Sequence, residues 1–348
     1  MRFRKEPAYS FDDVLLVPKH SKIASRQDVD LSTKLGDMKL TLPMLSANMD
    51  SITEGGMAIA MGKAGGAGVL HRFASASDVT NWLRSCSEAN VPGIVSVGTH
   101  IEQAILLVGH VYSHTLDAVC VDVAHGDHIK AVGVVKELRS RYPNLDIIAG
   151  NIATRHAAAN LVGAGANILK VGIGPGSVCS TRVVTGHGVP QLTAIMDVAE
   201  WRYSMDKHTA KIDIIADGGI RYPGDIVKAL AAGADAVMLG SLLAGTDEAA
   251  GERIVEHGMA YKTYRGMASR EVQTEKKNGR VPRVEGVSAK VPYRGPVRDT
   301  LDNLEAGIRS GLSYSGANTL DELREVAEFV VVTGNTLRES HPHHPYKL

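Results

Sequence analysis

The sequence predicts one closed barrel of eight parallel strands that alternate with helices, a (β/α)8 or TIM barrel. A length of 348 residues suits one such barrel with decorated loops. Apolar runs recur along the chain and are nearly continuous, which is typical of strands covered on both faces. Helix-like stretches with apolar residues three and four apart separate them. The eight runs are 42–50, 67–72, 93–99, 117–126, 146–151, 166–174, 212–219 and 235–241.

An open doubly wound sheet is the alternative fold, but it normally carries a glycine fingerprint directly after its first strand. The glycine-rich stretch 62–68 instead precedes an apolar run, so we expect its glycines to shape a turn from helix to strand. One catalytic domain over 1–348 is therefore expected.

The region after the eighth run departs from the repeat. Residues 258–300 are charged and contain glycine, proline and lysine. Long irregular segments in compact domains are usually functional, so a mobile active-site flap is expected here. The helix pattern at 319–332 is expected to complete the barrel, and 336–348 is expected to be a frayed tail.

Composition narrows the classes of function. Lysine plus arginine and aspartate plus glutamate each total 38, so no global basic footprint for nucleic acid exists. The amino terminus lacks the apolar stretch of a signal peptide, and no run is long enough to span a bilayer. Three scattered cysteines suit a reducing compartment rather than a disulfide framework. We expect a cytoplasmic protein with a small-molecule substrate and neither nucleic-acid nor membrane partners.

Polar residues recur where the predicted strands end, and barrel enzymes collect their chemistry at the carboxyl ends of the strands. Any one of these residues can equally be a cap or turn residue, so their recurrence at equivalent places is the informative part. They are Ser46, Asn48, Asp50, His71, Asp122, Asn151, Gly174, Asp217 and Ser241.

The most specific stretch is VGIGPGSVCSTR (171–182), the loop after the sixth run. Its glycines let the backbone approach a ligand or ion closely, and Ser177 with the neighbouring amides suits a phosphate. Cys179 is a candidate nucleophile, because a thiolate attacks well and also leaves well. Cys86 and Cys120 are expected to be buried structural cysteines.

A second candidate anion site lies in ADGGI (216–220) and VMLGS (237–241), which end the seventh and eighth runs. Loops after these two strands commonly hold a phosphate in barrels through backbone N–H groups. The Asp217 carboxylate can accept hydrogen bonds from two vicinal ribose hydroxyls, or serve as an N-cap or salt-bridge partner.

These motifs, together with YRGMAS and the opening FDDVLLVP, resemble the IMP dehydrogenase/GMP reductase family along nearly the whole chain. The resemblance implies an enzyme that binds IMP or GMP, forms a covalent thioimidate at purine C2 and stacks a nicotinamide alongside. It also implies a homotetramer and a monovalent cation, potassium. There is no sign of the regulatory CBS insert of many dehydrogenases, since His71 and Gly93 are joined by a single helical connection.

The resemblance assigns the catalytic roles to Cys179, its neighbour Thr181, and Glu285. With the strand-end residues, it assigns three further groups. The residues expected to bind the substrate are Ser46, Asn48, Ser177, Asp217, Gly218, Gly219, Gly240, Ser241, Met267 and Ala268. Those expected to bind the cofactor are Asp122, Ala124, His125 and Gly126. The cation is expected to bind Gly174, Gly176 and the Cys179 carbonyl.

The two branches of the family differ in the chemistry that accompanies hydride transfer. A dehydrogenase must hydrolyse its thioimidate, which in the family is the task of an Arg–Tyr pair in a long flap. The stretch 265–292 is shorter and contains no tyrosine, and a general base is worth about 10²–10⁴-fold. A reductase instead expels ammonia, with a proton that Thr181 and Glu285 can supply. We therefore expect a GMP reductase that converts GMP to IMP and ammonia with NADPH.

An IMP dehydrogenase that oxidises IMP to XMP with NAD is the alternative. GHGVPQ (186–191), DGGIRYPGD and YRGM are closer to dehydrogenase spellings, Ser180 replaces a threonine common in the family, and dehydrogenases also carry a glutamate near Glu285. A non-catalytic purine nucleotide sensor is a second alternative, although binding alone needs no nucleophile. No arginine dedicated to a 2′-phosphate can be placed, so NADPH and NADH are not distinguished.

Overall fold

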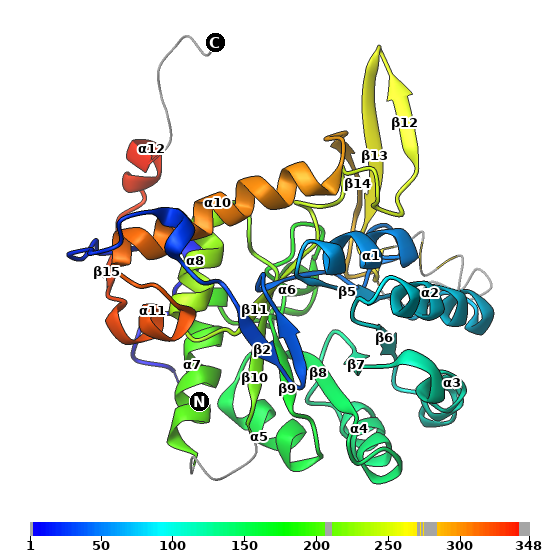
Figure 1. Ribbon diagram of the computed structural model, residues 1–348. Coiled ribbons are helices and arrows are strands. Elements are labelled where there is room, and N and C mark those ends of the chain that lie inside the picture. Colours follow the sequence, from blue (N-terminus) through cyan, green and yellow to red (C-terminus); the bar gives the residue numbers. More distant parts are fainter. Residues whose placement is uncertain (1–2, 206–210, 270–271, 273, 275–283, 341–348) are drawn as a thin grey trace.

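The computed structural model describes residues 3–205, 211–269, 272, 274 and 284–340, and its centre is a closed barrel of eight parallel strands (Figure 1). The barrel closes where the last of these strands pairs with the first, Val237 facing Met44. Each of the eight predicted runs contains one strand of the barrel, in the predicted order. They are β4 (Met44–Ser46), β5 (Ala67–Leu70), β6 (Ile94–Val97), β7 (Ala118–Asp122), β8 (Asp146–Ile152), β9 (Ile168–Val171), β10 (Asp213–Asp217) and β11 (Ala236–Leu239).

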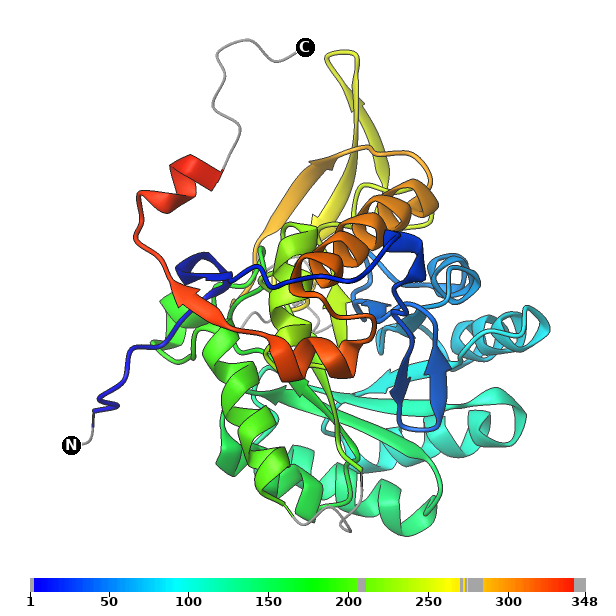
Figure 2. The same cartoon turned by 60° about the vertical axis from the view of Figure 1, so that its left-hand side comes forward.

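Helices connect the strands and cover the outside of the barrel (Figures 1 and 2). Strands β5 and β6 are joined through one helix, with no inserted domain. The connecting helices are α1 (Gly55–Lys63), α2 (Ala76–Glu88), α3 (Ile101–Thr115), α4 (Ile129–Arg141), α5 (Arg155–Gly163), α6 (Thr181–Thr185), α7 (Gln191–Ser204) and α8 (Pro223–Ala231), and α10 (Val297–Ser315) lies across the outside.

Apolar side chains fill both the interior of the barrel and the layer between strands and helices. Leu45, Ile148 and Ile215 belong to the interior, whereas Met44, Ile147 and Ile214 belong to the outer layer. Successive residues of one strand therefore enter different cores. This double burial explains why the runs are apolar at nearly every position.

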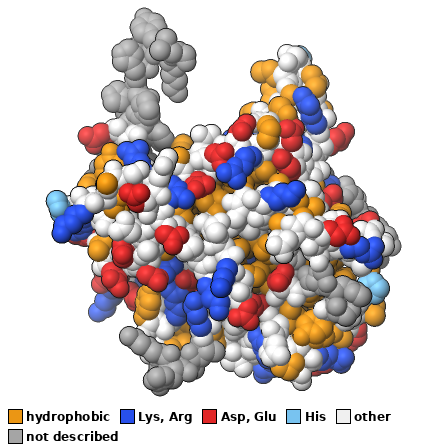
Figure 3. All heavy atoms as spheres, viewed as in Figure 1, with side chains coloured by type: hydrophobic (Ala, Val, Ile, Leu, Met, Phe, Trp, Pro, Cys, Tyr) orange, Lys and Arg blue, Asp and Glu red, His pale blue; other side chains and the backbone are white. Residues whose placement is uncertain are grey.

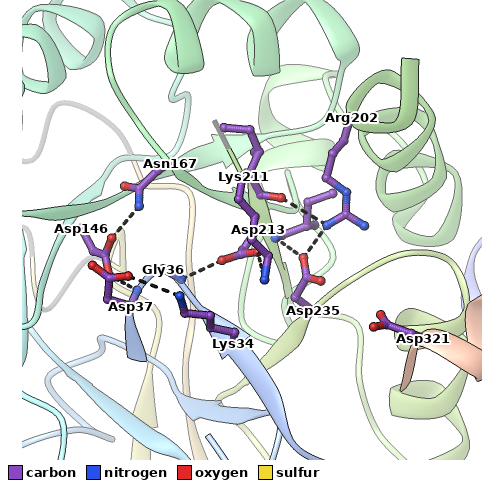
Figure 4. Close-up of polar contacts among 12 residues, drawn as sticks. Lys34, Gly36, Asp37, Asp146, Asn167, Arg202, Lys211, Asp213, Asp235 and Asp321 are labelled. Carbon is purple, nitrogen blue, oxygen red and sulfur yellow. Dashed lines mark hydrogen bonds and ion pairs between the residues drawn. The ribbon is translucent and has the colours of Figure 1, made fainter. Parts of the chain in front are cut away.

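A hairpin of β2 (Thr33–Leu35) and β3 (Met38–Leu40) covers the end of the barrel at which the strands begin. Leu35, Met38 and Leu40 are buried with the barrel interior. Its tip is held by two buried carboxylates (Figure 4): the Gly36 amide donates to Asp213 at 2.7 Å and the Asp37 amide to Asp146 at 2.6 Å. Gly36 has φ +63°, and a Cβ there would overlap the Asp146 carboxylate, so the tip requires glycine.

Burial and the nearby Asp235 raise the pKa of Asp213 to about 6. A carboxyl whose pKa is higher in the folded chain stabilises the fold below its unfolded pKa, and this contribution is lost as pH rises through 6. Asp213→Asn is therefore expected to increase the free energy of unfolding by about 2 kcal/mol at pH 8 and to leave it nearly unchanged at pH 4. Denaturant titrations at several pH values measure this difference.

Asp37→Asn is the matched control in the same hairpin, because the Asp37 side chain is 89% exposed. It is expected to change the free energy of unfolding by less than about 0.5 kcal/mol at every pH. A difference between wild type and Asp213→Asn that stays flat from pH 4 to pH 8 contradicts the assignment of this group.

The C-terminal region corrects the expected final helix. Helix α11 (Leu320–Val326) ends early, and β15 (Phe329–Val331) pairs antiparallel with β1 (Val14–Leu16) near the other end of the chain (Figure 2). The β-branched and aromatic residues at 329–331 suit a strand once a partner is present. In the expected tail, Thr336–Ser340 forms the short helix α12, and 341–348 lie outside the described residues.

The segment 258–300 is more regular than the sequence predicts. Strands β12 (Arg253–Glu256), β13 (Met259–Arg265) and β14 (Ser288–Pro292) form an antiparallel sheet that projects from the barrel (Figure 1). Much of the connection from β13 to β14 lies outside the described residues, so mobility of this flap stays a prediction.

No helix in the described part of the chain is long and apolar enough to cross a membrane. On the face shown in Figure 3, lysine and arginine side chains are interspersed with aspartate and glutamate, in line with the formal net charge of zero.

Candidate active site

Cys179 is the first of three side chains that are hydrogen-bonded in series. It lies on the exposed loop between β9 and α6. Its Sγ is 3.2 Å from Thr181 Oγ1, and the Thr181 hydroxyl donates to Glu285 Oε2 at 2.9 Å. A thiol proton therefore has a direct path through the hydroxyl to a carboxylate. The three residues predicted as catalytic are brought together.

Backbone pairing holds Glu285 against the cysteine loop. The Ser180 amide donates to the Glu285 carbonyl at 3.0 Å, and the Val287 amide donates to the Val178 carbonyl at 3.0 Å. The Glu285 amide donates in turn to the Ala268 carbonyl at 3.0 Å. This last bond brings the turn at Met267–Ala268, predicted to meet the purine base, beside the same loop.

The predicted phosphate residues converge from three strand ends. Gly218 and Gly219 have φ +89° and +83°, and a Cβ on Gly218 would lie 3.1 Å from the Gly176 nitrogen. The Ser177 hydroxyl is 3.4 Å from the Tyr264 hydroxyl, and a Cβ on Gly240 would lie 2.9 Å from the same hydroxyl. Burial raises the pKa of Tyr264, which therefore stays neutral and able to donate.

The carboxylates predicted for ribose and cofactor, Asp217 and Asp122, share a partner that sequence reasoning missed. Lys170 Nζ lies 2.8 Å from Asp122 Oδ1 and 2.8 Å from Asp217 Oδ2. Asn151 Nδ2 also donates to Asp217 Oδ2 at 2.8 Å. The available signal was a lysine inside the largely apolar run 166–174.

These contacts determine the charge states of Lys170 and Asp122 at the end of the barrel where the strands end, which is called the barrel mouth below. Burial alone disfavours the Lys170 ammonium, but the two carboxylates outweigh it and raise the pKa of Lys170. Burial likewise disfavours the Asp122 carboxylate, but Lys170 and Arg72 outweigh it and lower the pKa of Asp122. The Arg72 guanidinium stacks on the Phe73 ring at 4.3 Å. Arg72 is a second site residue that the sequence did not reveal.

The other predicted cofactor residues follow β7 directly. Ala124 and His125 are exposed, and the Gly126 amide donates to the Asn151 carbonyl at 2.8 Å. A Cβ on Gly126 would lie 2.8 Å from the Gly150 carbonyl carbon, so the segment packs tightly on the end of β8. Asn48 lies beside Asp122.

The side chains of three predicted strand-end residues are buried or already paired within the protein. Ser46 is fully buried, and its hydroxyl accepts from Thr53 at 2.8 Å. His71 is buried with its Nδ1 accepting from the Phe73 amide, and Asp50 forms an ion pair with Arg265 at 2.9 Å.

The predicted cation loop is held in shape by Arg182. Its guanidinium donates to the Ile173 carbonyl at 3.1 Å and to the Val189 carbonyl at 2.7 Å. Gly174 has φ +81°, and a Cβ there would overlap the Arg182 side chain. The loop offers neutral backbone oxygens, a donor set that suits a monovalent cation. Within the described residues, no cluster of three or more His, Cys, Asp or Glu side chains could hold a metal ion.

Fold and geometry together define the class: a (β/α)8-barrel protein whose strand ends present a thiol, a hydroxyl and a carboxyl group in series. The family model described as the IMP dehydrogenase / GMP reductase domain matches residues 8–343. The chain belongs to this family. Both activities in the family's name are redox reactions, so the protein is an oxidoreductase of purine metabolism.

Three curated relatives of the chain are each named inosine-5'-monophosphate dehydrogenase. The chain is 36% identical to the one from Borreliella burgdorferi, with 98% of each chain covered. It is 36% identical to that of Bacillus subtilis (98% and 96% covered) and 34% identical to that of Methanocaldococcus jannaschii (97% and 95%). The Bacillus subtilis alignment spans 480 positions, more than the 348 residues of this chain, so that relative carries inserted residues that this chain lacks.

Proposed function

We propose that this protein catalyses a nicotinamide-dependent redox reaction at C2 of a purine nucleoside monophosphate, through a covalent adduct on Cys179. The observation that carries the proposal is the hydrogen-bonded series Cys179–Thr181–Glu285. It supplies a nucleophile, a path for its proton, and a carboxylate to receive that proton. The nicotinamide group, when bound, donates or accepts the hydride.

Oxidation of IMP to XMP with NAD is the first candidate for the direction, because the relatives found carry the name of that activity. This reverses the order that the sequence alone favoured. The oxidation ends with hydrolysis of the adduct, which needs a base. Glu285 can take a proton from water through the Thr181 hydroxyl, which donates to Glu285 Oε2 at 2.9 Å.

Reductive deamination of GMP to IMP with NADPH is the second candidate, and one observation favours it. The stretch 265–292 contains no tyrosine, so a water-activating Arg–Tyr pair cannot be formed there. In this direction the same Thr181–Glu285 pair delivers a proton to the departing ammonia.

In either direction the substrate is proposed to lie across the ends of β9, β10 and β11. Asp217 would accept from the ribose, Met267 and Ala268 would contact the base, and Asp122, Ala124, His125 and Gly126 would line the cofactor side. The 5′-phosphate would be held by Ser177, Gly219, Gly240 and Ser241, and Gly218 would belong to the same substrate site.

Three further properties are proposed: potassium binding and a homotetramer on the family resemblance, and a cytoplasmic location on the composition of the sequence. Carbonyls of Gly174, Gly176 and Cys179 would hold potassium, the chain would form a homotetramer, and it would work in the cytoplasm. Dialysis against potassium-free buffer tests the first through the rate, and light scattering tests the second.

Two parallel assays decide the direction. The purified protein is given IMP with NAD, and separately GMP with NADPH, while absorbance at 340 nm and ammonia are followed. NADH formation from IMP establishes the dehydrogenase, whereas NADPH consumption with ammonia release establishes the reductase. No turnover in either assay, together with measurable nucleotide binding, refutes the enzyme proposal in favour of a nucleotide sensor.

A further inference from the structure

A single buried ammonium lies between the two carboxylates that the proposed function assigns to different ligands. Lys170 is on β9 and only 2% exposed, and it contacts Asp122 at the end of β7 and Asp217 at the end of β10. The two carboxylate side chains are 20% and 21% exposed, so each keeps a surface toward the barrel mouth.

The charges around this ammonium do not cancel among the three residues. Two acids share one cation, with the buried Cys120 thiol beside Lys170 and the Arg72 guanidinium near Asp122. An ammonium has three N–H donors and can serve both carboxylates at once. Breaking such a buried group by removing one partner is strongly destabilising, because the remaining charge stays uncompensated.

We propose that Lys170 is a positioning residue that holds the Asp122 and Asp217 carboxylates in place, orients them toward the two ligands, and couples the nucleotide and cofactor subsites. The identity of the ligands rests on the proposed function, whereas the buried arrangement does not. A ligand hydroxyl that donates to one carboxylate weakens that carboxylate's hold on Lys170. The ammonium then bonds more strongly to the other carboxylate. Binding at one subsite therefore changes affinity at the other, and the effect is reciprocal.

The first test is the stability of Lys170→Met as a function of pH, which needs no ligand. In the wild type, the lowered pKa of Asp122 gives a stabilisation that is present near neutrality and lost as the pH falls. Without the ammonium, burial raises the pKa of Asp122. The variant is then expected to be least stable near neutrality and to recover as the pH falls toward 4, the opposite trend to Asp122 in the wild type.

Lys262→Met is the matched control, since Lys262 is a second buried lysine, with its Nζ donating to the carbonyls of Thr246 and Asp247 at 3.0 and 3.1 Å. Backbone carbonyls do not titrate, so its loss of stability is expected to vary little with pH. Adding Asp122→Asn to Lys170→Met is expected to restore much of the stability lost at neutral pH. Equal pH profiles for the two lysine variants overturn the charge-holding role.

The second test measures ligands and rate on the holoenzyme in whichever assay the wild type shows activity. Lys170→Met is expected to raise KM for nucleotide and for cofactor at least tenfold each and to move the acid limb of kcat/KM upward by a pH unit or more. Lys170→Arg, which keeps the charge, is expected to recover part of both effects. Unchanged KM values with an unshifted acid limb refute the positioning role.

The coupling itself is measured by calorimetric titration of the wild type with IMP or GMP, alone and with saturating dinucleotide. A dissociation constant that changes at least threefold in the wild type and becomes independent of dinucleotide in Lys170→Met supports coupling through this residue. The same change in the wild type and in Lys170→Met overturns it. Inactivity of the wild type in both assays counts against the proposed function alone, because the stability test still decides whether Lys170 holds the carboxylates.

Discussion

Cys179→Ala is expected to lower turnover by about 10⁴-fold or more while nucleotide still binds, because the covalent route then has no nucleophile. Neither of the other two cysteines can replace it. Cys86 and Cys120 are buried, and burial raises their pKa values to about 11 and about 12, so both remain protonated thiols. Steady-state rates measure the loss of turnover, and calorimetric titration with IMP or GMP measures the retained nucleotide binding.

Cys86→Ala is the matched control, because it also removes a thiol but lies in α2, away from the barrel mouth. It is expected to keep the wild-type rate. Iodoacetamide is expected to modify Cys179 in the folded protein, and bound nucleotide is expected to slow that reaction. A residual rate above about 1% of wild type in Cys179→Ala eliminates the covalent step.

The second large effect is expected at Glu285. Glu285→Gln preserves the size of the side chain and can still accept from Thr181, but it cannot receive a proton. A fall in kcat of about 10²–10³-fold is expected, the usual worth of general acid–base catalysis. Thr181→Val breaks the same path and is expected to have a similar effect, and the double variant is expected to be little slower than either single one. Measured rates of the three variants test this.

Thr181→Ser is the control for the relay, since it keeps the hydroxyl between Cys179 and Glu285. It is expected to stay within about tenfold of wild type. Strictly additive effects of Thr181→Val and Glu285→Gln would show that the two residues act independently and would remove the relay from the mechanism.

Sequence reasoning predicted the barrel well because the pattern it used is local. Each strand of the barrel enters two apolar layers, so its residues are apolar at successive positions and the strand is visible in its own few residues. The cysteine loop was visible for the same reason, since glycines with positive φ such as Gly174 determine the local backbone.

The segment 329–331 is a part of the fold that local patterns did not predict. It continues the helix pattern of the preceding residues, yet it is a strand because β1, more than 300 residues away, provides the hydrogen bonds. An edge pairing between chain ends leaves no local pattern, so the expected final helix was wrong there.

By itself, the sequence determined the eight strands, their order and the family, and it singled out the cysteine loop; all of these depend on neighbouring residues or on motif order. Tertiary structure decided which charges meet. Glu285 reaches Thr181 from 104 positions away, and Lys170, which looks out of place in an apolar run, is stabilised by carboxylates on two other strands. Coulombic and hydrogen-bonding partners depend on distance in space, and the closure of the barrel sets that distance.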